Sequence, residues 1–113
     1  MPQRVVILPG NGCTPIERCN WYSWLAAELR KDGIDCSCQS MPDPYRASRT
    51  RWLPFAREKL GADADAIVVG HSSGAEAAMR LAEETKLAAI VLVSACVSDL
   101  GEESEKVGGE RPR

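Results

Sequence analysis

Short apolar runs alternate along this chain with longer segments whose apolar residues recur at helical spacing. Residues 5–8, 67–69 and 88–93 are continuous apolar runs rich in β-branched residues, a pattern typical of strands buried on both faces of a parallel sheet. Residues 34–38 instead alternate apolar and polar side chains, which predicts a strand with one buried face. Four strands are therefore expected.

The segments between these strands predict three helices. The first places Trp21 and Trp24 on its apolar face, the second covers residues 52–60, and the third starts after Gly74. We expect the two tryptophans to pack against the sheet, with the lining of a substrate pocket as the alternative. Pro54 lacks a backbone donor and crowds the preceding turn, so we expect a kink or two short helices there.

Together these elements follow the order βαβαβαβ, which is typical of an α/β fold with one parallel sheet and right-handed crossovers. The predicted strand order is 2-1-3-4, with helices flanking the sheet, and it brings the first and third strands side by side. Residues 1–100 form one domain in this interpretation. Residues 101–113 are nearly without apolar side chains, so we expect a disordered tail.

Composition narrows the function classes. The 113 residues carry a formal net charge of −2, which argues against a nucleic-acid surface because such surfaces are normally basic. No apolar run reaches the roughly 18 residues of a membrane helix, and no signal peptide precedes the first strand. Five cysteines, an odd number, do not suit a closed disulfide framework. The sequence therefore predicts a cytoplasmic protein without nucleic-acid or membrane partners.

Candidate chemistry lies at the end of the third strand. Gly70, Ser72 and Gly74 fit the pattern Gly-x-Ser-x-Gly between a predicted strand and a predicted helix, which is the sequence of a nucleophile elbow. Such a turn lifts the central hydroxyl clear of the sheet, and the two glycines let strand and helix cross closely. Ser72 is thus the candidate nucleophile. The alternative is a chance match to a short pattern, which the flanking strand and helix disfavour.

Backbone N–H groups beside this serine could form an oxyanion hole, the donors that stabilise the negative oxygen of an acyl-transfer intermediate. The turn after the first strand contains Asn11 and Gly12, and parallel sheets bind ligands at the carboxyl ends of their strands. We expect the N–H groups of Asn11, Gly12 and Ser73 to converge on the nucleophile, with a plain strand-terminating turn as the alternative. The Ser73 side chain is expected to form a capping box with Glu76.

No cofactor is predicted. A dinucleotide fingerprint fails because Pro15 occupies the place of its third glycine, and no Gly-Lys-Ser/Thr follows the turn to bind a nucleoside triphosphate. Cys36 and Cys38 would share one face of a strand, but no second ligand pair at zinc spacing exists and the sole histidine is His71. We interpret the two cysteines as small core residues.

Further blocks of sequence outside the elbow form a pattern of their own. They are Pro9-Gly10-Asn11-Gly12, Trp21-Tyr22-x-Trp24, Met41-Pro42-Asp43-Pro44, Trp52-Leu53-Pro54-Phe55, Ile90-Val91-Leu92-Val93-Ser94-Ala95 and Ser98-Asp99-Leu100-Gly101. With the elbow, these blocks resemble the retinoblastoma-binding protein nine family of small serine hydrolases. The resemblance covers nearly all of residues 4–101. It implies a three-layer α/β-hydrolase fold, a Ser-Asp-His triad with Ser72 as nucleophile, and ester, acyl or peptide-like substrates.

The resemblance also implies an incomplete triad. The family proteins continue through further strand–helix units that carry the triad Asp and His, so this chain looks like an N-terminal portion or a truncated product. His71 directly precedes the nucleophile, and its side chain is expected to point away from the hydroxyl. Asp99 is a weak substitute acid, because it has no imidazole to orient. The alternative function is a catalytically inactive truncated form that acts as a binding module.

A second departure concerns a protein partner. Some family members carry Leu-x-Cys-x-Glu before the nucleophile strand, the motif by which they are linked to the retinoblastoma protein. Residues 60–64 are Leu-Gly-Ala-Asp-Ala here, so the Cys and the Glu are absent. We therefore expect no binding to such pockets and predict a small-molecule or peptide-like acyl substrate as the partner.

Overall fold

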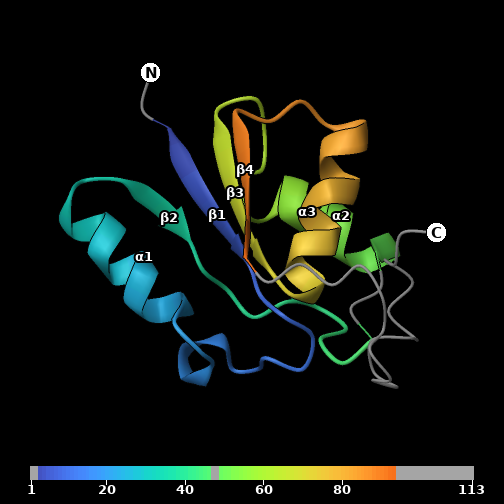
Figure 1. Ribbon diagram of the computed structural model, residues 1–113, viewed down its shortest axis with the longest axis horizontal. Helices are drawn as coiled ribbons and strands as arrows, with labels where there is room; N and C mark the ends of the chain where they lie inside the picture. The colour runs from blue at the N-terminus through green and yellow to red at the C-terminus, as the bar shows by residue number, and fades with distance from the viewer. Residues whose placement is uncertain (1–2, 47–48, 94–113) are drawn as a thin grey trace.

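The protein is a four-stranded parallel sheet with helices on both faces, as seen in a computed structural model that describes residues 3–46 and 49–93 (Figure 1). The strands are β1 (Arg4–Leu8), β2 (Asp35–Ser37), β3 (Ala66–His71) and β4 (Ala89–Val93). Their order in the sheet is β2-β1-β3-β4, and all pairs are parallel. This confirms the predicted 2-1-3-4 arrangement.

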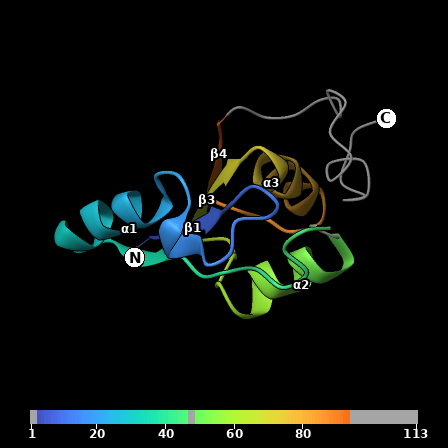
Figure 2. The ribbon, with the colours of Figure 1, turned by 90° about the horizontal axis from the view of Figure 1, so that it is seen from below.

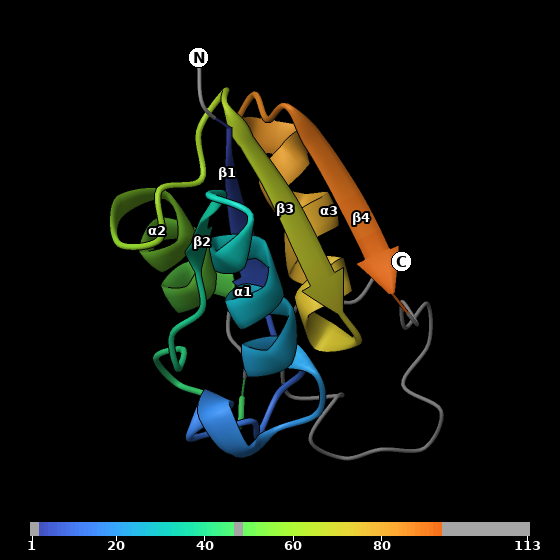
Figure 3. The ribbon, with the colours of Figure 1, turned by 90° about the vertical axis from the view of Figure 1, so that its left-hand side faces the viewer.

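The helices form the two outer layers of a three-layer structure. α1 (Tyr22–Lys31) lies on one side of the strands, and α2 (Arg49–Glu58) and α3 (Ser73–Glu84) lie on the other, as Figure 2 shows from below. Figure 3 shows the same layers with α1 in front of the sheet and α2 and α3 behind it. A short 3₁₀ helix, η1 (Ile16–Arg18), precedes α1. None of the described helices is long and apolar enough to span a membrane.

Two hydrophobic cores separate these layers, because successive side chains of a strand point to opposite faces. On the side of α2 and α3 the buried strand residues are Val6, Leu8, Ala66 and Val68. On the side of α1 they are Val5, Ile7, Cys36 and Val69. β1 and β3 thus contribute to both cores, which confirms the prediction that their apolar runs are buried on both faces.

Two expectations about the helices were wrong in part. α2 is one helix with Pro54 inside it, rather than two short helices. Pro54 removes a single N–H, whose acceptor four residues earlier is Thr50 in the first turn, so only one backbone bond is forgone. On α1 the buried residues are Tyr22 and Ala26, whereas Trp24 is 64% exposed. Trp21 does pack against the core on this side of the sheet, so the expectation is confirmed for Trp21 and wrong for Trp24.

β4 is less buried than its continuous apolar run predicts. It pairs only with β3 and forms one edge of the sheet among the described residues. Val91 is 46% exposed and Leu92 is 40% exposed. The residues after Val93 lie outside the described part of the chain, and so do Asp99 and the predicted disordered tail.

Candidate active site

Ser72 forms the turn between β3 and α3. Its backbone has φ 58° and ψ −117°, a conformation that costs a non-glycine residue on the order of 1–3 kcal/mol. The Ser72 N–H donates to the Val93 carbonyl at the end of β4, at 3.1 Å. A strand, a strained turn and a helix thus follow each other in the order of a nucleophile elbow. Ser72 lies at the carboxyl ends of the central strands, as the sequence predicts.

Two glycines flank this turn where no side chain fits. A Cβ on Gly70 would collide with the Gly74 carbonyl and lie 2.7 Å from the Cα of Ala75. A Cβ on Gly74 would collide with the Leu8 carbonyl and lie 2.6 Å from the Pro9 carbonyl oxygen. The atoms in the way belong to the backbone and cannot rotate aside. Gly70 lets the strand meet its own helix, and Gly74 lets that helix meet the end of β1.

The turn after β1 lies beside the elbow, because β1 and β3 pair up to Leu8 and Gly70. Two of the N–H groups in this turn are bonded to acceptors. The Gly10 N–H donates to the Tyr22 hydroxyl at 2.9 Å, and the Gly12 N–H donates to the Pro44 carbonyl at 2.7 Å. No acceptor among the described residues takes the Asn11 N–H. Of the turn's donors predicted for the oxyanion hole, Asn11 is therefore the stronger candidate and Gly12 the weaker.

The side chains of Asn11 and Ser73 connect the two candidate donor segments. The Ser73 hydroxyl donates to the Asn11 carboxamide oxygen at 2.9 Å, and the Asn11 amide nitrogen donates to the Tyr45 carbonyl at 3.3 Å. Ser73 is the first residue of α3, and the N-cap position belongs to Ser72. The predicted capping box was therefore wrong, because it requires Ser73 rather than Ser72 at the N-cap position. Glu76 is buried, with 2% of its surface exposed.

Tyr22 is a residue of this region that the sequence did not single out. It is fully buried, and its hydroxyl lies 2.7 Å from Nδ1 of His71. The His71 ring also packs edge-on against Trp21, with ring centres 5.4 Å apart. The histidine before the nucleophile is thus held by α1. The spacing of residues 22, 25, 26 and 29, which fits one helix face better than 21 and 24, could have identified Tyr22.

The comparisons with known proteins agree with this geometry. The sequence profile described as "Serine hydrolase" matches residues 5–109. The chain belongs to the serine hydrolase family. The resemblance stated from the sequence is thereby confirmed.

Similarity extends to a named serine hydrolase. The chain is 45% identical over 109 residues to the serine hydrolase RBBP9 of Rattus norvegicus, an alignment that covers 96% of this chain and 59% of the relative. It also resembles the crystal structure of the ydeN gene product from B. subtilis, with a TM-score of 0.72 and 23% identity over 96% of this chain and 58% of that one. The second likeness concerns the fold alone. The chain spans about three fifths of the length of both proteins.

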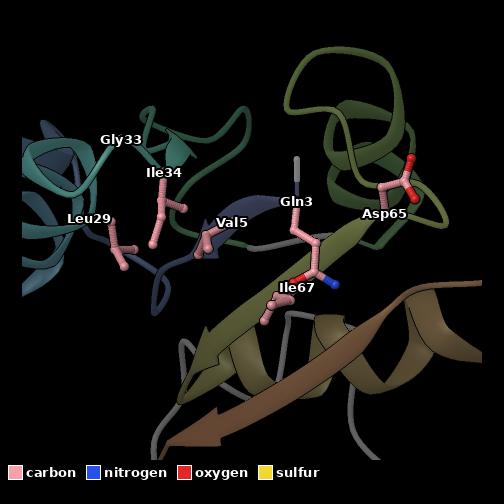
Figure 4. A pocket seen from close by; sticks show the side chains of 7 residues that line it. All are labelled: Gln3, Val5, Leu29, Gly33, Ile34, Asp65 and Ile67. Atoms are coloured by element: carbon pink, nitrogen blue, oxygen red, sulfur yellow. The ribbon is translucent and has the colours of Figure 1, made fainter. Parts of the chain in front are cut away.

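A separate hollow lies far from the elbow. It has a volume of about 580 Å³ and is lined by Gln3, Val5, Leu29, Gly33, Ile34, Asp65 and Ile67, all labelled in Figure 4. These residues stand at the amino ends of β1 and β3 and at the end of α1. Because parallel sheets bind ligands at the opposite ends of their strands, the hollow is not the serine hydrolase site.

The cysteine pair on and beside β2 is part of a core. Cys36 is buried under α1, and Cys38 packs against the same cluster. Burial raises the pKa of the Cys36 thiol to about 11, which disfavours the thiolate that a metal or a redox reaction requires. Their placement confirms the interpretation of both as core residues.

Proposed function

We propose that this chain supplies the nucleophile and part of the oxyanion hole of a serine hydrolase that acts on ester, acyl or peptide-like substrates. Ser72 attacks the carbonyl carbon, and the N–H groups of Asn11 and Ser73 stabilise the oxyanion that forms. The strained backbone of Ser72 between two irreplaceable glycines is the observation that carries the proposal. Such strain persists only where the surrounding structure imposes it.

The general base is the open part of this proposal. A serine hydroxyl needs a base to accept its proton during the attack. The sequence contains one histidine, and the Nδ1 atom of that residue, His71, is engaged by Tyr22. We therefore propose that the base, and the acid that orients it, come from outside these 113 residues, as the longer relatives suggest.

The engaged histidine also favours a second candidate function. A chain with an elbow and no available imidazole could bind an acyl ligand or a partner without turnover. Hydrolysis that depends on Ser72 would exclude this binding-module alternative. We also propose a cytoplasmic location, which the thiols of Cys13, Cys19, Cys36 and Cys38 support because they are unpaired and reduced thiols are usual in that compartment.

Covalent labelling tests the nucleophile. A fluorophosphonate forms a stable bond to a reactive serine oxygen and releases fluoride, so prolonged incubation followed by peptide mapping identifies the serine that reacts. In this chain fused to the part of the rat relative that it does not match, which would supply the base, we expect an adduct on Ser72, its loss in Ser72→Ala and its retention in Ser73→Ala, which keeps the backbone donor. An adduct on Ser73 with Ser72 unmodified, or no adduct on either residue, would refute the assignment.

A further inference from the structure

Three elements meet at one buried hydroxyl group beside the candidate nucleophile. Tyr22 comes from the first turn of α1 and is fully buried. Its hydroxyl lies 2.9 Å from the Gly10 nitrogen in the turn after β1 and 2.7 Å from Nδ1 of His71 at the end of β3. One side chain thus joins the turn that carries a candidate oxyanion donor to the strand that carries the elbow.

The direction of the hydrogen bond with Gly10 follows from the groups involved, whereas the direction of the bond with His71 depends on the tautomer of the ring. A backbone N–H can only donate, so the Tyr22 hydroxyl accepts from Gly10. We assign the single hydroxyl proton to the bond with Nδ1 of His71, which is a strong acceptor when the ring carries its proton on Nε2. His71 is then a neutral imidazole with its proton on Nε2. Burial lowers the pKa of His71, which favours this neutral form. Burial also raises the pKa of Tyr22, so the hydroxyl keeps the proton it donates.

The other groups near the Tyr22 hydroxyl do not change the assignment of its proton to the bond with His71. The Cys13 thiol lies 3.9 Å from the Tyr22 oxygen and can only be a weak second donor or acceptor. Cys19 lies beside Cys13, and burial raises the pKa of the Cys19 thiol to about 11. Trp21 contacts His71 through its ring edge. Within the described residues, burial is the cause that lowers the His71 pKa, and no charged side chain contributes to it.

The bonded glycine lies directly against the nucleophile. A Cβ built on Gly10 would be 3.5 Å from the Cβ of Ser72 and 3.7 Å from the Tyr22 oxygen. Gly10 is therefore in packing distance of both, and it immediately precedes Asn11. On the far side of the turn, Ser73 bonds the Asn11 side chain and Gly12 bonds Pro44. Tyr22 binds Gly10, the residue of this turn that the contacts of Asn11 and Gly12 do not hold.

We propose that Tyr22 is a positioning residue of the site, whose hydroxyl holds Gly10 against the elbow with His71 as its acceptor and so sets the Asn11 N–H relative to Ser72. This inference rests on the proposed function, because the oxyanion formed by attack of Ser72 is what the Asn11 N–H would stabilise. A displacement of about 1 Å at such a donor can cost about a hundredfold in rate. Loss of the hydroxyl also leaves the buried Gly10 N–H without its acceptor.

The experiment compares Tyr22→Phe with Trp24→Phe, a substitution at an exposed position of the same helix. Nitrogen-15 NMR of the 113-residue chain reports the Nδ1 protonation of His71 and the amide signals of Gly10, Asn11 and Ser73. Fluorophosphonate labelling of the same variants, fused to the part of the rat relative that supplies the proposed base, reports the reactivity of Ser72. For Tyr22→Phe we expect a shifted Nδ1 resonance, faster exchange of the Gly10 amide, displaced Asn11 and Ser73 signals, and labelling slowed about tenfold to a hundredfold. Trp24→Phe should leave all four unchanged.

The outcomes separate this inference from the function on which it rests. Unchanged labelling in Tyr22→Phe, with Gly10 exchange accelerated, would overturn the positioning role. If Ser72 is not labelled in the unaltered fusion, the proposed function has failed, and undisturbed Asn11 and Ser73 signals in Tyr22→Phe would then overturn the inference as well. Should Tyr22→Phe not fold, His71→Gln and His71→Leu replace it, because only Gln offers an acceptor. Equal labelling rates in these two variants would also overturn the positioning role of Tyr22.

Discussion

Ser72 occupies a backbone conformation that its own chemistry disfavours, and two neighbouring glycines make that conformation possible. The positive φ of Ser72 directs the chain from β3 into α3 within one residue. The tight crossing that results brings backbone atoms to positions that a Cβ on Gly70 or Gly74 would need. The motif is thus a packing requirement as well as a chemical one. Substitution at either glycine should show this independently of any activity.

Gly74→Ala should destabilise the fold. In an ordinary helix this change stabilises by up to about 1 kcal/mol, because glycine is a poor helix former. Here the added methyl group meets the carbonyls of Leu8 and Pro9, and overpacking of this kind costs typically about 1–3 kcal/mol. Urea unfolding measures the difference. Glu83→Ala, on the exposed side of the same helix, is the control. Increased stability in Gly74→Ala would contradict the close approach of α3 to β1.

His71 should make the chain less stable as the pH falls below the ordinary pKa of histidine. Burial lowers its pKa from the ordinary value of 6.5, so below that pH the unfolded chain binds this proton more readily than the folded chain. The contribution of His71 to stability is therefore fully present above about pH 6.5 and is lost as the pH falls below it. Protonation of Nδ1 would also remove the acceptor of the Tyr22 hydroxyl.

Urea midpoints at about pH 7.5 and pH 5.5 measure this effect. We expect a larger decrease for the unaltered chain than for His71→Gln, whose carboxamide does not titrate. Carboxylates titrate in both proteins, so the comparison isolates His71. An equal decrease in the two proteins would show that His71 does not titrate differently in the folded and unfolded states.

At the scale of the elements, β4 is an edge strand of the sheet that the described residues form. Its partner β3 lies on one side only, and its apolar residues Val91 and Leu92 remain substantially accessible. An unpaired edge offers a row of backbone donors and acceptors to another chain, and exposed apolar side chains strengthen such pairing. β1 has a strand neighbour on each side, so it has no unpaired edge.

The chain should therefore associate through β4. We expect dimers or larger species in size-exclusion chromatography at micromolar concentration, and a shift toward monomer in Val91→Lys, because lysine is one of the residues that natural edge strands use against pairing. Trp24→Lys, which adds the same charge at an exposed position of α1, is the control. A sharply melting monomer of the unaltered chain would contradict this prediction.

The connection between α2 and β3 bears on protein partners. Residues 60–64 lack the Cys and Glu of the pocket-binding motif, and Leu60 and Ala62 are buried with 1% and 3% of their surface exposed. Asp63 is bound by Arg4, whose guanidinium lies 2.7 Å from its carboxylate. Leu60 and Ala62 thus belong to the core, and Asp63 is paired with Arg4.

A peptide of residues 59–66 should therefore show no saturable binding to a retinoblastoma-type pocket. The measurement is a fluorescence titration with the labelled peptide. A matched peptide in which Ala62 and Ala64 are replaced by Cys and Glu restores the motif and is the positive control. Micromolar affinity or tighter for the native peptide would overturn the prediction.

At the scale of the whole molecule, the function proposed above gives the chain one part of a serine hydrolase site. The nucleophile, the turn after β1 and their supporting contacts all lie within residues 3–93. Loss of the triad histidine costs a serine protease about 10⁶-fold in kcat. The part that survives, on the order of 10³–10⁴ over water, comes from the oxyanion hole and binding. Those are the parts proposed for this chain.

The 113-residue chain should therefore hydrolyse p-nitrophenyl acetate only in trace amounts, changed less than a few fold by Ser72→Ala. Fusion to the part of the rat relative that this chain does not match should raise the rate and make it depend on Ser72, because a base would then be supplied. Robust turnover by the chain itself that Ser72→Ala abolishes would show that a base exists within it.

Local patterns in the sequence were enough for the elements, the strand order and the elbow. Continuous apolar runs identify β1 and β3 because both of their faces are buried, and Gly70, Ser72 and Gly74 identify the turn because few residues satisfy its steric demands. The adjacency of β1 and β3 fits the right-handed crossover rule because α1 and α2 lie on opposite faces of the sheet. The apolar runs and the turn can be predicted because they depend on backbone sterics and on residues close together in the sequence.

Only the tertiary structure decided which polar groups meet. The bonds from Tyr22 to Gly10 and His71 join residues 12 and 49 positions apart, and no spacing rule predicts them. The engagement of the Gly12 N–H by Pro44 and the bond from Ser73 to Asn11 are of the same kind. Periodicity could place Tyr22 on the buried face of α1, but only the packed structure shows which polar groups its hydroxyl meets.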